Sequence, residues 1–412
     1  MKRSINNIPE GYKRNSTLGV IPNEWEVKRL GEIFEIIAGG DIELAHVKNN
    51  KDEVFKYPIY ANAAKNKGLY GFSDIYKIDY DCITVSGRGD IGIANARSGK
   101  FYPIVRLLVL NPQQKIDTIY FENAINIMRI YCENTGVPQL TSPQLSKYKV
   151  LVPPLPEQRK IAEVLSTWDK AIEKQTLLVE KLELRKKGLM QQLLTGKKRL
   201  HGFNGVAWKK VKLDEVTTFL SNNSLSRDNL NTLRGSILNI HYGDVLIKLP
   251  TIVNVSLVDL PFINEELNIV SKDFVSEGDI IMADTAEDGT VGKACEVVNV
   301  GNNKVVSGLH TILIHPTIAF APMFLGYYLN SKEYHKQILS IMQGIKVYSI
   351  TKDALRKTNI KIPPLEEQNA IAEILSVCDN EITLAKQKLD TLRLQKKGLM
   401  QVLLTGKKRV EL

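Results

Sequence analysis

Two stretches of the chain repeat apolar positions at alternating steps of four and three, which is the spacing of the buried seam of a coiled coil. Each seam runs for about five heptads, more than the ~3–4 that indicate a coiled coil. The first seam comprises Ile161, Leu165, Trp168, Ile172, Val179, Leu182, Leu189 and Leu193. The second comprises Ile371, Leu375, Cys378, Ile382, Leu389, Leu392, Leu399 and Leu403. Both seams break at matching places, at Gln175 or Ala385 and again at Lys186 or Lys396.

Both stretches have clear start and stop signals. Each opens after a proline pair, Pro153–Pro154 or Pro363–Pro364, and each ends at a Thr-Gly pair, at 195–196 or 405–406. Glycine commonly ends a helix, and the Lys-Lys-Arg that follows suits the negative end of the helix dipole. The signals predict two helices of about 38 residues, each ~57 Å long at 1.5 Å per residue.

The two stretches are copies of one another. Residues 153–199 and 363–409 align without a gap at an offset of 210, with about 27 identities over roughly 47 positions. A fainter repeat precedes each copy, because Trp25 and Trp208 begin similar segments. A period of ~200 residues is too long for a solenoid and indicates duplication of a whole domain with its connector.

The repeat divides the chain into alternating variable and helical parts. The predicted parts are residues 1–152, 153–199, 200–362 and 363–412. Each variable part is ~150 residues, the size of one ordinary domain. The most compact arrangement pairs the helices antiparallel, with a pseudo-twofold axis and a nearly circular course of the chain. The expected fold class is therefore α+β: two mixed α/β domains separated by two long antiparallel coiled-coil helices.

The variable parts combine strands with a few helices. Residues 81–94 predict a strand, a glycine-rich turn and a second strand, and residues 278–294 form the matching element. Apolar periodicity predicts a helix across 117–132 and another across 320–342.

Composition narrows the class of protein. With 43% hydrophobic residues, the chain is not of the disordered type. No apolar run approaches the ~20 residues of a membrane span, and the N-terminus has no signal-peptide core, so a cytoplasmic protein is expected. The four cysteines are scattered, which argues against a disulfide framework. The net charge of +10 makes a polyanionic partner plausible, although much of the charge lies on the repeated helical segments.

Catalytic and metal-binding motifs are not evident. The Leu-Thr-Gly-Lys-Lys-Arg segments end helices and lack the leading glycine of a phosphate-binding loop. Ser86–Gly89 does not form the Gly-x-Ser-x-Gly elbow of a hydrolase. The six histidines include no i, i+4 pair. Two related but divergent domains on a rigid spacer therefore favour a two-headed binding protein over a catalyst.

The duplicated signature is the most specific feature of the sequence. It reads Pro-Pro-Leu-x-Glu-Gln, then Ile-Ala-Glu-x-Leu-Ser, then Lys-Lys-Gly-Leu-Met-Gln-x-Leu-Leu-Thr-Gly, beginning at 153 and again at 363. With this signature the chain resembles, over essentially its whole length, the DNA-specificity subunit of type I restriction–modification systems. The resemblance implies that each variable domain reads one half of a split double-stranded DNA target through the major groove. It also implies that the helix pair sets the spacer between the half-sites and that the subunit itself is not catalytic.

The same resemblance implies partners and their cofactors. Two methylation subunits, which use S-adenosylmethionine, would dock on the helices and the adjoining domain surfaces. Two restriction subunits would use ATP and Mg to translocate and cleave DNA. No cofactor and no membrane are expected for this subunit itself.

DNA-contacting residues are expected on polar loops, because arginine pairs with guanine and asparagine with adenine in bidentate fashion. The candidates in the first domain are Asn62, Lys65, Asn66, Lys67, Arg88 and Arg97, with Lys48 and Asn49 as weaker ones. Those in the second are Asn222, Asn223, Arg227, His241, Tyr242, Lys248, Lys293, Lys346 and Tyr348. Arg88 is favoured because its flanking glycines permit close approach to a groove. For any single one of these residues, a solvated surface loop is the more common explanation.

Two alternatives stay open at this point: a protein scaffold that does not read DNA, and a fused enzyme. The Lys-Lys-Arg ends are hypothesised to touch the DNA backbone or a partner subunit. Gly188 and Gly398, inside the helices, are expected to permit close helix approach or a bend, unless they are bystanders.

Overall fold

The computed structural model describes residues 8–16, 18–63, 65–130, 138–267 and 273–411. The chain forms two compact units, unit 1 with residues 1–176 and 387–412 and unit 2 with residues 177–386. Each unit therefore holds one variable domain, one end of the first long helix and one end of the second.

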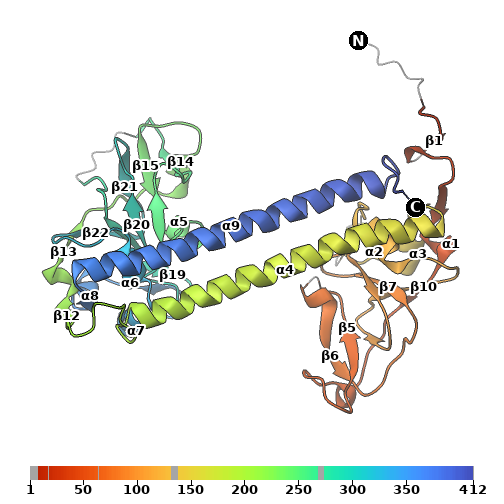
Figure 1. The fold of residues 1–412 in the computed structure, drawn as a ribbon, viewed down its shortest axis with the longest axis horizontal. Helices are drawn as coiled ribbons and strands as arrows, with labels where there is room; N and C mark the ends of the chain where they lie inside the picture. Colours follow the sequence, from red (N-terminus) through yellow and green to blue (C-terminus); the bar gives the residue numbers. More distant parts are fainter. Residues whose placement is uncertain (1–7, 17, 64, 131–137, 268–272, 412) are drawn as a thin grey trace, which may run out of the picture. The chain divides into compact units, whose positions relative to one another are not determined.

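The two long helices are α4 (Leu155–Leu193) and α9 (Leu365–Leu403), each of 39 residues (Figure 1). Both begin directly after their proline pair, as predicted. Gly196 and Gly406 then take the left-handed φ values of 71° and 69° that end a helix. Among the described residues, no helix is long and apolar enough to cross a membrane.

The predicted seam is the buried stripe of both helices, since every seam residue is buried or half-buried. The lysines that interrupt it are paired rather than exposed. Lys396 Nζ lies 2.6 Å from Asp169 Oδ1 in unit 1, and Lys186 Nζ lies 2.5 Å from Asp379 Oδ1 in unit 2. Within each unit these pairs, with others near them, place the start of one helix antiparallel to the end of the other.

The variable domain of unit 1 contains two sheets and a helix. The larger sheet has the order β4 (Phe34–Ala38), β10 (Leu108–Pro112), β7 (Cys82–Val85) and β8 (Ala94–Arg97). The smaller has the order β6 (Leu69–Ser73), β5 (Tyr57–Tyr60) and β9 (Tyr102–Pro103). Helix α2 (Thr118–Asn126) packs on β7 and β8.

The variable domain of unit 2 repeats this plan with additional strands. Its larger sheet has the order β13 (Thr217–Leu220), β22 (Thr311–Pro316), β18 (Ile280–Ala283), β20 (Ala294–Val298) and β16 (Ile252–Asn254). Its smaller sheet has the order β14 (Leu230–Asn231), β17 (Phe262–Ile263), β15 (Ile237–Ile240) and β21 (Lys304–Ser307). The helices are α5 (Tyr242–Ile247), α6 (Phe324–Leu329) and α7 (Lys332–Ile341).

The remaining short elements join the domains to the long helices or to each other. They are β1 (Tyr12–Asn15), β2 (Gly19–Pro22), β3 (Glu26–Arg29), α1 (Leu30–Ile33), α3 (Ser142–Ser146), β11 (Lys149–Val152), β12 (Lys209–Lys212), α8 (Lys352–Arg356), β24 (Asn359–Ile362), β19 (Thr285–Ala286) and β23 (Tyr348–Ser349). The strand after each domain-starting tryptophan pairs with the strand before the long helix, β3 with β11 and β12 with β24.

The predicted strand pairs are confirmed as β7 with β8 and β18 with β20. The predicted helices are shorter than expected. The first ends at Asn126, and its predicted end at 131–132 lies outside the described residues. The second is divided into α6 and α7, because the Ser331 side chain accepts a hydrogen bond from Tyr334 N and starts a new helix.

The two domains are built on one frame. In unit 1, Asn126 forms two hydrogen bonds with the backbone of Ala94, at 2.9 and 3.0 Å. In unit 2, Asn330 forms the same pair with Ala294, at 3.1 and 2.8 Å. These matching hydrogen bonds show that Ala94 and Ala294 occupy equivalent positions in the two domains.

The strand registers extend that correspondence across the larger sheet. Ala94 pairs with Val85, which pairs with Leu108. In unit 2 the matching residues are Ala294, Met282 and Ile312. The duplication seen in the helices therefore covers the variable domains, where the sequences have diverged.

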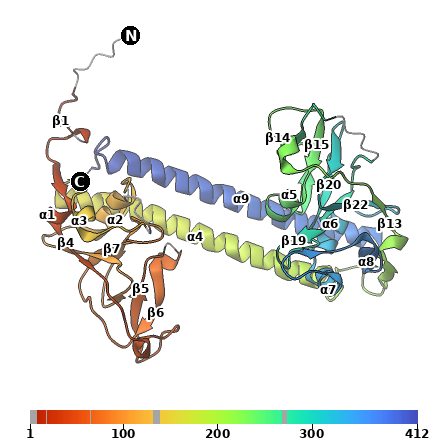
Figure 2. The same cartoon turned by 180° about the vertical axis from the view of Figure 1, so that it is seen from behind.

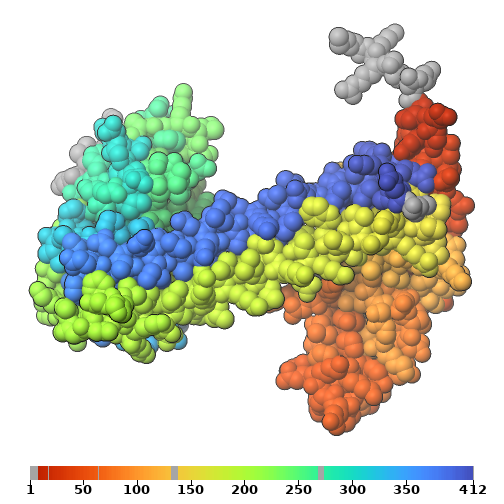
Figure 3. Space-filling view, viewed as in Figure 1, coloured from red at the N-terminus to blue at the C-terminus, as the bar shows by residue number. Residues whose placement is uncertain are grey.

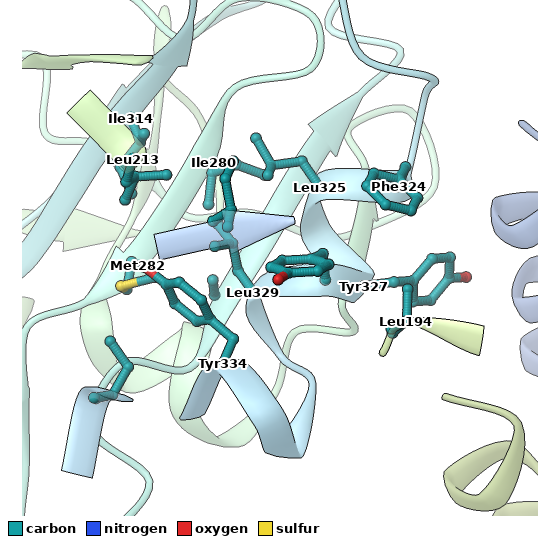
Figure 4. Packing of buried hydrophobic residues seen from close by; sticks show 14 of the residues in the cluster. Leu194, Leu213, Ile280, Met282, Ile314, Phe324, Leu325, Tyr327, Leu329 and Tyr334 are labelled. Atoms are coloured by element: carbon teal, nitrogen blue, oxygen red, sulfur yellow. The ribbon is translucent and has the colours of Figure 1, made fainter. Parts of the chain in front are cut away.

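The ends of the long helices belong to the domain cores. Ile161 and Leu403 lie in the core of unit 1, and Leu193 and Ile371 lie in that of unit 2. Figure 4 shows the core of unit 2, where the hydroxyl of Tyr327 points out of the cluster; it donates to Asp379 of α9 at 2.7 Å. Because burying such an aliphatic side chain contributes about 1.5–3 kcal/mol, the outer seam positions anchor the helices to each domain.

Candidate nucleic-acid interface

Three chain segments meet at one corner of each variable domain: the residues after the inner strand of the smaller sheet, the turn after β7 or β18, and the residues before β10 or β22. We call these residues the polar corner. In unit 1 it comprises Asn62, Gly87, Arg88, Val105 and Arg106; in unit 2 it comprises Tyr242, Asp284, Thr285, Leu309 and His310.

Asn62 joins the segments of the unit 1 corner. Its side-chain oxygen accepts a hydrogen bond from Gly87 N at 2.8 Å, and its amide donates to Val105 O at 2.5 Å. Arg88 is half-buried and donates from Nη2 to Gln139 Oε1 at 2.9 Å. Asn62 therefore shapes the corner, while Arg88 lies at its surface on a loop that Gln139 supports.

Arg97 lies inside unit 1 instead of on the predicted surface. Its side chain donates to Thr84 Oγ1 at 2.9 Å and to the carbonyl of Lys67, and it stacks 3.6 Å from the centroid of the Tyr60 ring. Burial lowers its pKa. Arg97 is only 7% exposed, so its observed contacts hold the 65–68 turn against the sheet.

The turn held by Arg97 presents the other predicted residues. Lys65, Asn66 and Lys67 are exposed, and the last two have a left-handed φ of 51°. The weaker candidate Lys48 pairs with Asp52 at 2.8 Å, and Asn49 is exposed. Contact of this group with DNA stays a prediction.

Three predicted residues of unit 2 lie around Asp244 in α5, the helix labelled beside β20 in Figure 2; α5 packs against β18 and β20. His241 caps the helix by accepting a hydrogen bond from Gly243 N at 3.2 Å. Arg227 Nη1 donates to Asp244 Oδ2 at 2.7 Å, and Lys248 Nζ lies 3.5 Å from Asp244 Oδ1. Burial, and then the nearby Arg227 charge, lower the pKa of His241, the direction that favours a neutral imidazole able to accept this hydrogen bond.

Tyr242 and His310 form the centre of the unit 2 corner. Their ring centroids are 5.3 Å apart in an edge-to-face arrangement. His310 Nδ1 lies 3.4 Å from Asp284 Oδ1 and 3.4 Å from Thr285 Oγ1. The His310 side chain is 48% exposed, so the corner presents a histidine, a tyrosine and a threonine to solvent.

The remaining candidates of unit 2 divide between inside and surface. Asn223 donates to Asn239 Oδ1 at 2.7 Å and to Ser307 O at 3.0 Å. Lys293 Nζ donates to the carbonyl of Leu246 at 2.8 Å, and burial lowers its pKa. Both side chains therefore have internal partners. Asn222 is exposed, but its amide also donates to the carbonyl of Gly308, at 3.2 Å.

Lys346 and Tyr348 lie beside the polar corner of unit 2. Tyr348 is on β23, which pairs with β19 starting at Thr285. Lys346 is exposed in the preceding loop, next to Ile345, whose exposed fraction is 92%. An apolar side chain so exposed was not expected from the sequence.

A buried carboxylate at the start of α4 joins distant parts of unit 1. Glu157 accepts from Trp25 Nε1 at 2.9 Å and from Arg409 Nε and Nη2 at 2.8 Å each. Arg409 also reaches Glu24 at 2.7 Å. Figure 3 shows the end of the chain, in dark blue, against its N-terminal residues, in red.

Unit 2 contains the same arrangement at the start of α9. Glu367 accepts from Trp208 Nε1 at 2.9 Å and from Arg199 Nε and Nη2 at 2.7 and 2.8 Å. The hypothesis for the Lys-Lys-Arg ends is therefore wrong for their arginines, which face buried carboxylates. The exposed lysines are 197, 198, 407 and 408, and for them the hypothesis stays a prediction.

The glutamine that follows each of these glutamates also has a fixed role. Gln158 accepts from Asp117 N at 3.0 Å and donates to Pro153 O at 2.8 Å. Gln368 accepts from Ala321 N at 3.0 Å and donates to Pro363 O at 2.9 Å. The repeated Glu-Gln thus ties each long helix to its domain.

Within the described part of the chain, no group of three or more histidine, cysteine or acidic side chains could hold a metal ion.

The family model for the type I restriction modification DNA specificity domain matches residues 22–182 and 205–394. The chain belongs to this family. The double match agrees with the duplicated frame and makes the chain a type I restriction–modification specificity subunit, which recognises a DNA sequence. Specificity subunits are non-catalytic, consistent with the expectation that this chain is not an enzyme.

Curated relatives support the assignment over the full length. The chain is 25% identical to the type I restriction enzyme MjaVIII specificity subunit of Methanocaldococcus jannaschii, over 98% of this chain and 97% of that protein. It is 28% identical to the putative MjaX specificity subunit of the same organism, over 98% and 97%.

Solved structures share the fold. The S subunit of a type I restriction–modification system from M. genitalium matches with a TM-score of 0.59 at 14% identity, covering 95% of this chain and 98% of that one. A chain from a structure describing complex assembly and conformational transition of the type I system matches with a TM-score of 0.55 at 15% identity, covering 94% and 99%.

Proposed function

We propose that this subunit recognises a bipartite, asymmetric double-stranded DNA target, with one half-site read by each variable domain. One observation carries the proposal: the same backbone corner occurs in both domains with different exposed side chains. Asn62 and Tyr242 follow equivalent strands, since β5 pairs with β9 as β15 pairs with β21. Side chains that hydrogen-bond to base edges determine which DNA sequence is recognised. Different side chains on the same backbone frame therefore favour two different half-sites.

The helix pair is proposed to set the spacer between the half-sites. Half-sites on one face of B-DNA lie ~34–36 Å apart or at multiples of that distance, and helices of 39 residues are long enough to fix such a separation. Inserting seven residues at matching positions of α4 and α9 should change the spacer and leave both half-sites unchanged. A changed half-site would contradict this role.

Two methylation subunits, which use S-adenosylmethionine, are proposed to dock on the outer faces of the helices. Leu184 and Leu394 occupy equivalent positions and are both 70% exposed. One turn later, a Cβ at Gly188 or Gly398 would have no described atom within 4 Å. The expectation that these glycines allow close helix approach within the chain is therefore wrong.

A glycine inside a helix costs about 1 kcal/mol of stability relative to alanine. Since packing within the chain does not require Gly188 and Gly398, their presence beside exposed leucines favours docking of a partner. Identical faces on both helices favour two copies of one partner. Gly188→Leu with Gly398→Leu should weaken co-purification of the methylation subunit. The control is Val377→Leu, an exposed position that the repeat does not share. Restriction subunits using ATP and Mg complete the proposed complex.

The recognition proposal is tested by selection from a random double-stranded DNA library. The full chain, co-purified with its methylation subunit, should enrich two separated half-sites of different sequence. Enrichment of no sequence would favour a protein scaffold. Methyl transfer by this chain alone would favour a fused enzyme.

A further inference from the structure

We propose that Arg106 and His310 are equivalent specificity-determining residues, each of which contacts a base in the half-site of its own domain. The proposal rests on the proposed function, because it assigns base contacts within the same two-domain recognition. Neither residue stands out in the sequence. Both emerge from the register of the two sheets.

The equivalence follows from strand pairing. Leu108 and Ile312 are matching positions, because they pair with Val85 and Met282, which the matching asparagine hydrogen bonds relate. Two residues earlier, the chain carries Arg106 in unit 1 and His310 in unit 2. The two positions therefore lie at the same point of the frame, at the entry to the second strand of the larger sheet.

Both residues have the same unusual backbone conformation. The φ angle is 58° at Arg106 and 56° at His310, in the left-handed region that costs a non-glycine residue roughly 1 kcal/mol or more. Glycine would remove this cost. Two different large polar side chains instead stand at the strained position, which indicates that the side chains themselves are needed.

Each side chain also lies among groups suited to base edges. Arg106 is exposed and follows Val105, whose carbonyl is held by Asn62. His310 has Tyr242 at a ring distance of 5.3 Å and Thr285 Oγ1 at 3.4 Å. A tyrosine ring and a hydroxyl beside a histidine resemble a small site for a base pair.

The chemistry distinguishes the two positions. Arginine can donate two hydrogen bonds to O6 and N7 of a guanine in the major groove. An imidazole offers a single donor or acceptor at each nitrogen, and with Asp284 Oδ1 at 3.4 Å the Nδ1 atom is directed toward the protein. We therefore expect Arg106 to require a guanine in the first half-site, and His310 to select its base through Nε2.

The test uses variants that keep the left-handed backbone, Arg106→Gly and His310→Gly, because glycine adopts positive φ without strain. Each full chain is co-purified with its methylation subunit and selects from a random double-stranded DNA library. Arg106→Gly should reduce discrimination at one base pair of one half-site about tenfold or more, as expected for a lost bidentate contact. His310→Gly should act only on the other half-site.

The matched controls replace an exposed arginine and an exposed histidine outside the polar corners: Arg159→Ala in unit 1 and His201→Ala in unit 2. Both variants should keep the wild-type motif. Uniform weakening by Arg106→Gly across all sequences would indicate a phosphate contact and overturn the inference. An unchanged motif with either glycine variant would overturn it too, and the bipartite motif of the wild type would still support the proposed function. If the wild type enriches no motif, the proposed function fails, and the inference fails with it.

Discussion

The guanidinium of Arg409 forms two parallel hydrogen bonds with the buried carboxylate of Glu157, at 2.8 Å each. Arg409 lies near the end of the chain, whereas Glu157 lies in the first turn of α4. Trp25 donates to the same carboxylate, so the segment around Trp25 and the segment after α9 meet there. In unit 2, Arg199 and Trp208 make this contact within one continuous segment. The repeat thus preserves an internal clamp of Trp, Glu and Arg.

Removal of the Arg409 side chain should destabilise unit 1 more than removal of the Glu157 charge. Arg409→Met leaves a carboxylate that is 0% exposed without its ion-pair partner, and breaking a buried pair in this way costs about 3 kcal/mol or more. Glu157→Gln leaves a guanidinium that is 33% exposed and can be hydrated, so its cost should be smaller. Denaturant unfolding measures both.

The control for the clamp is Lys408→Met, since Lys408 is adjacent and exposed. It should have little effect on the free energy of unfolding. If Arg409→Met were as mild as Lys408→Met, the clamp would contribute nothing to stability.

Gly188→Ala and Gly398→Ala should each stabilise the isolated chain by about 1 kcal/mol, which is the difference in helix propensity between glycine and alanine. The reason is that the added methyl group would meet no described atom within 4 Å at either position. Thermal unfolding checks this as an increase in Tm. A decrease would mean that the glycines are needed for packing within the chain.

Glu296 should make the stability of unit 2 depend on pH. Its carboxylate accepts hydrogen bonds from Met323 N and Gly326 N at the start of α6, at 2.5 and 2.7 Å. Burial nevertheless raises its pKa to about 7, from an ordinary value of 4.5. The folded state therefore favours the protonated form.

Because the folded pKa is the higher one, the stability contributed by Glu296 is fully present below pH 4.5 and is lost as the pH rises through about 7. The loss should be on the order of 3 kcal/mol. Glu296→Gln should remove this part of the pH dependence, measured by unfolding between pH 5 and 8, and Glu265→Gln, at an exposed position, should not. An unaltered pH profile in Glu296→Gln would contradict the assignment.

Arg97→Lys should loosen the 65–68 turn without unfolding unit 1. A lysine keeps the charge but cannot contact Thr84 and the carbonyl of Lys67 with the fixed geometry of a guanidinium. Hydrogen exchange should increase at residues 65–68 and stay unchanged in α2. Equal exchange in the variant and the wild type would show that Arg97 does not position this turn.

The helical part of the fold is predictable from the sequence because its signals are local. Seam periodicity, the proline pairs and the terminal glycines determine α4 and α9, and the repeat makes each copy evidence for the other. The partners of Lys186 and Lys396 are harder to predict from the sequence. Asp379 and Asp169 lie on the other helix, and only the packed structure brings each pair together.

The candidate site is only partly predictable, since exposure depends on contacts that are distant in sequence. Arginine and asparagine are usually exposed, but the side chains of Arg97 and Asn223 turn inward to partners on other strands. Arg106 and His310 lie outside any motif, and their equivalence depends on strand register and a positive φ. The role of Glu157 could have been suspected from its repetition in Glu367, but its partners Trp25 and Arg409 could not.

The central claim is that one chain reads two different half-sites. Its most direct test is to co-express the subunit with its methylation subunit in a host without other adenine methylation and to map methylated adenines across the genome. We predict a single motif composed of two unlike half-sites separated by an unread spacer of fixed length. A continuous motif, or two identical half-sites, would contradict the account.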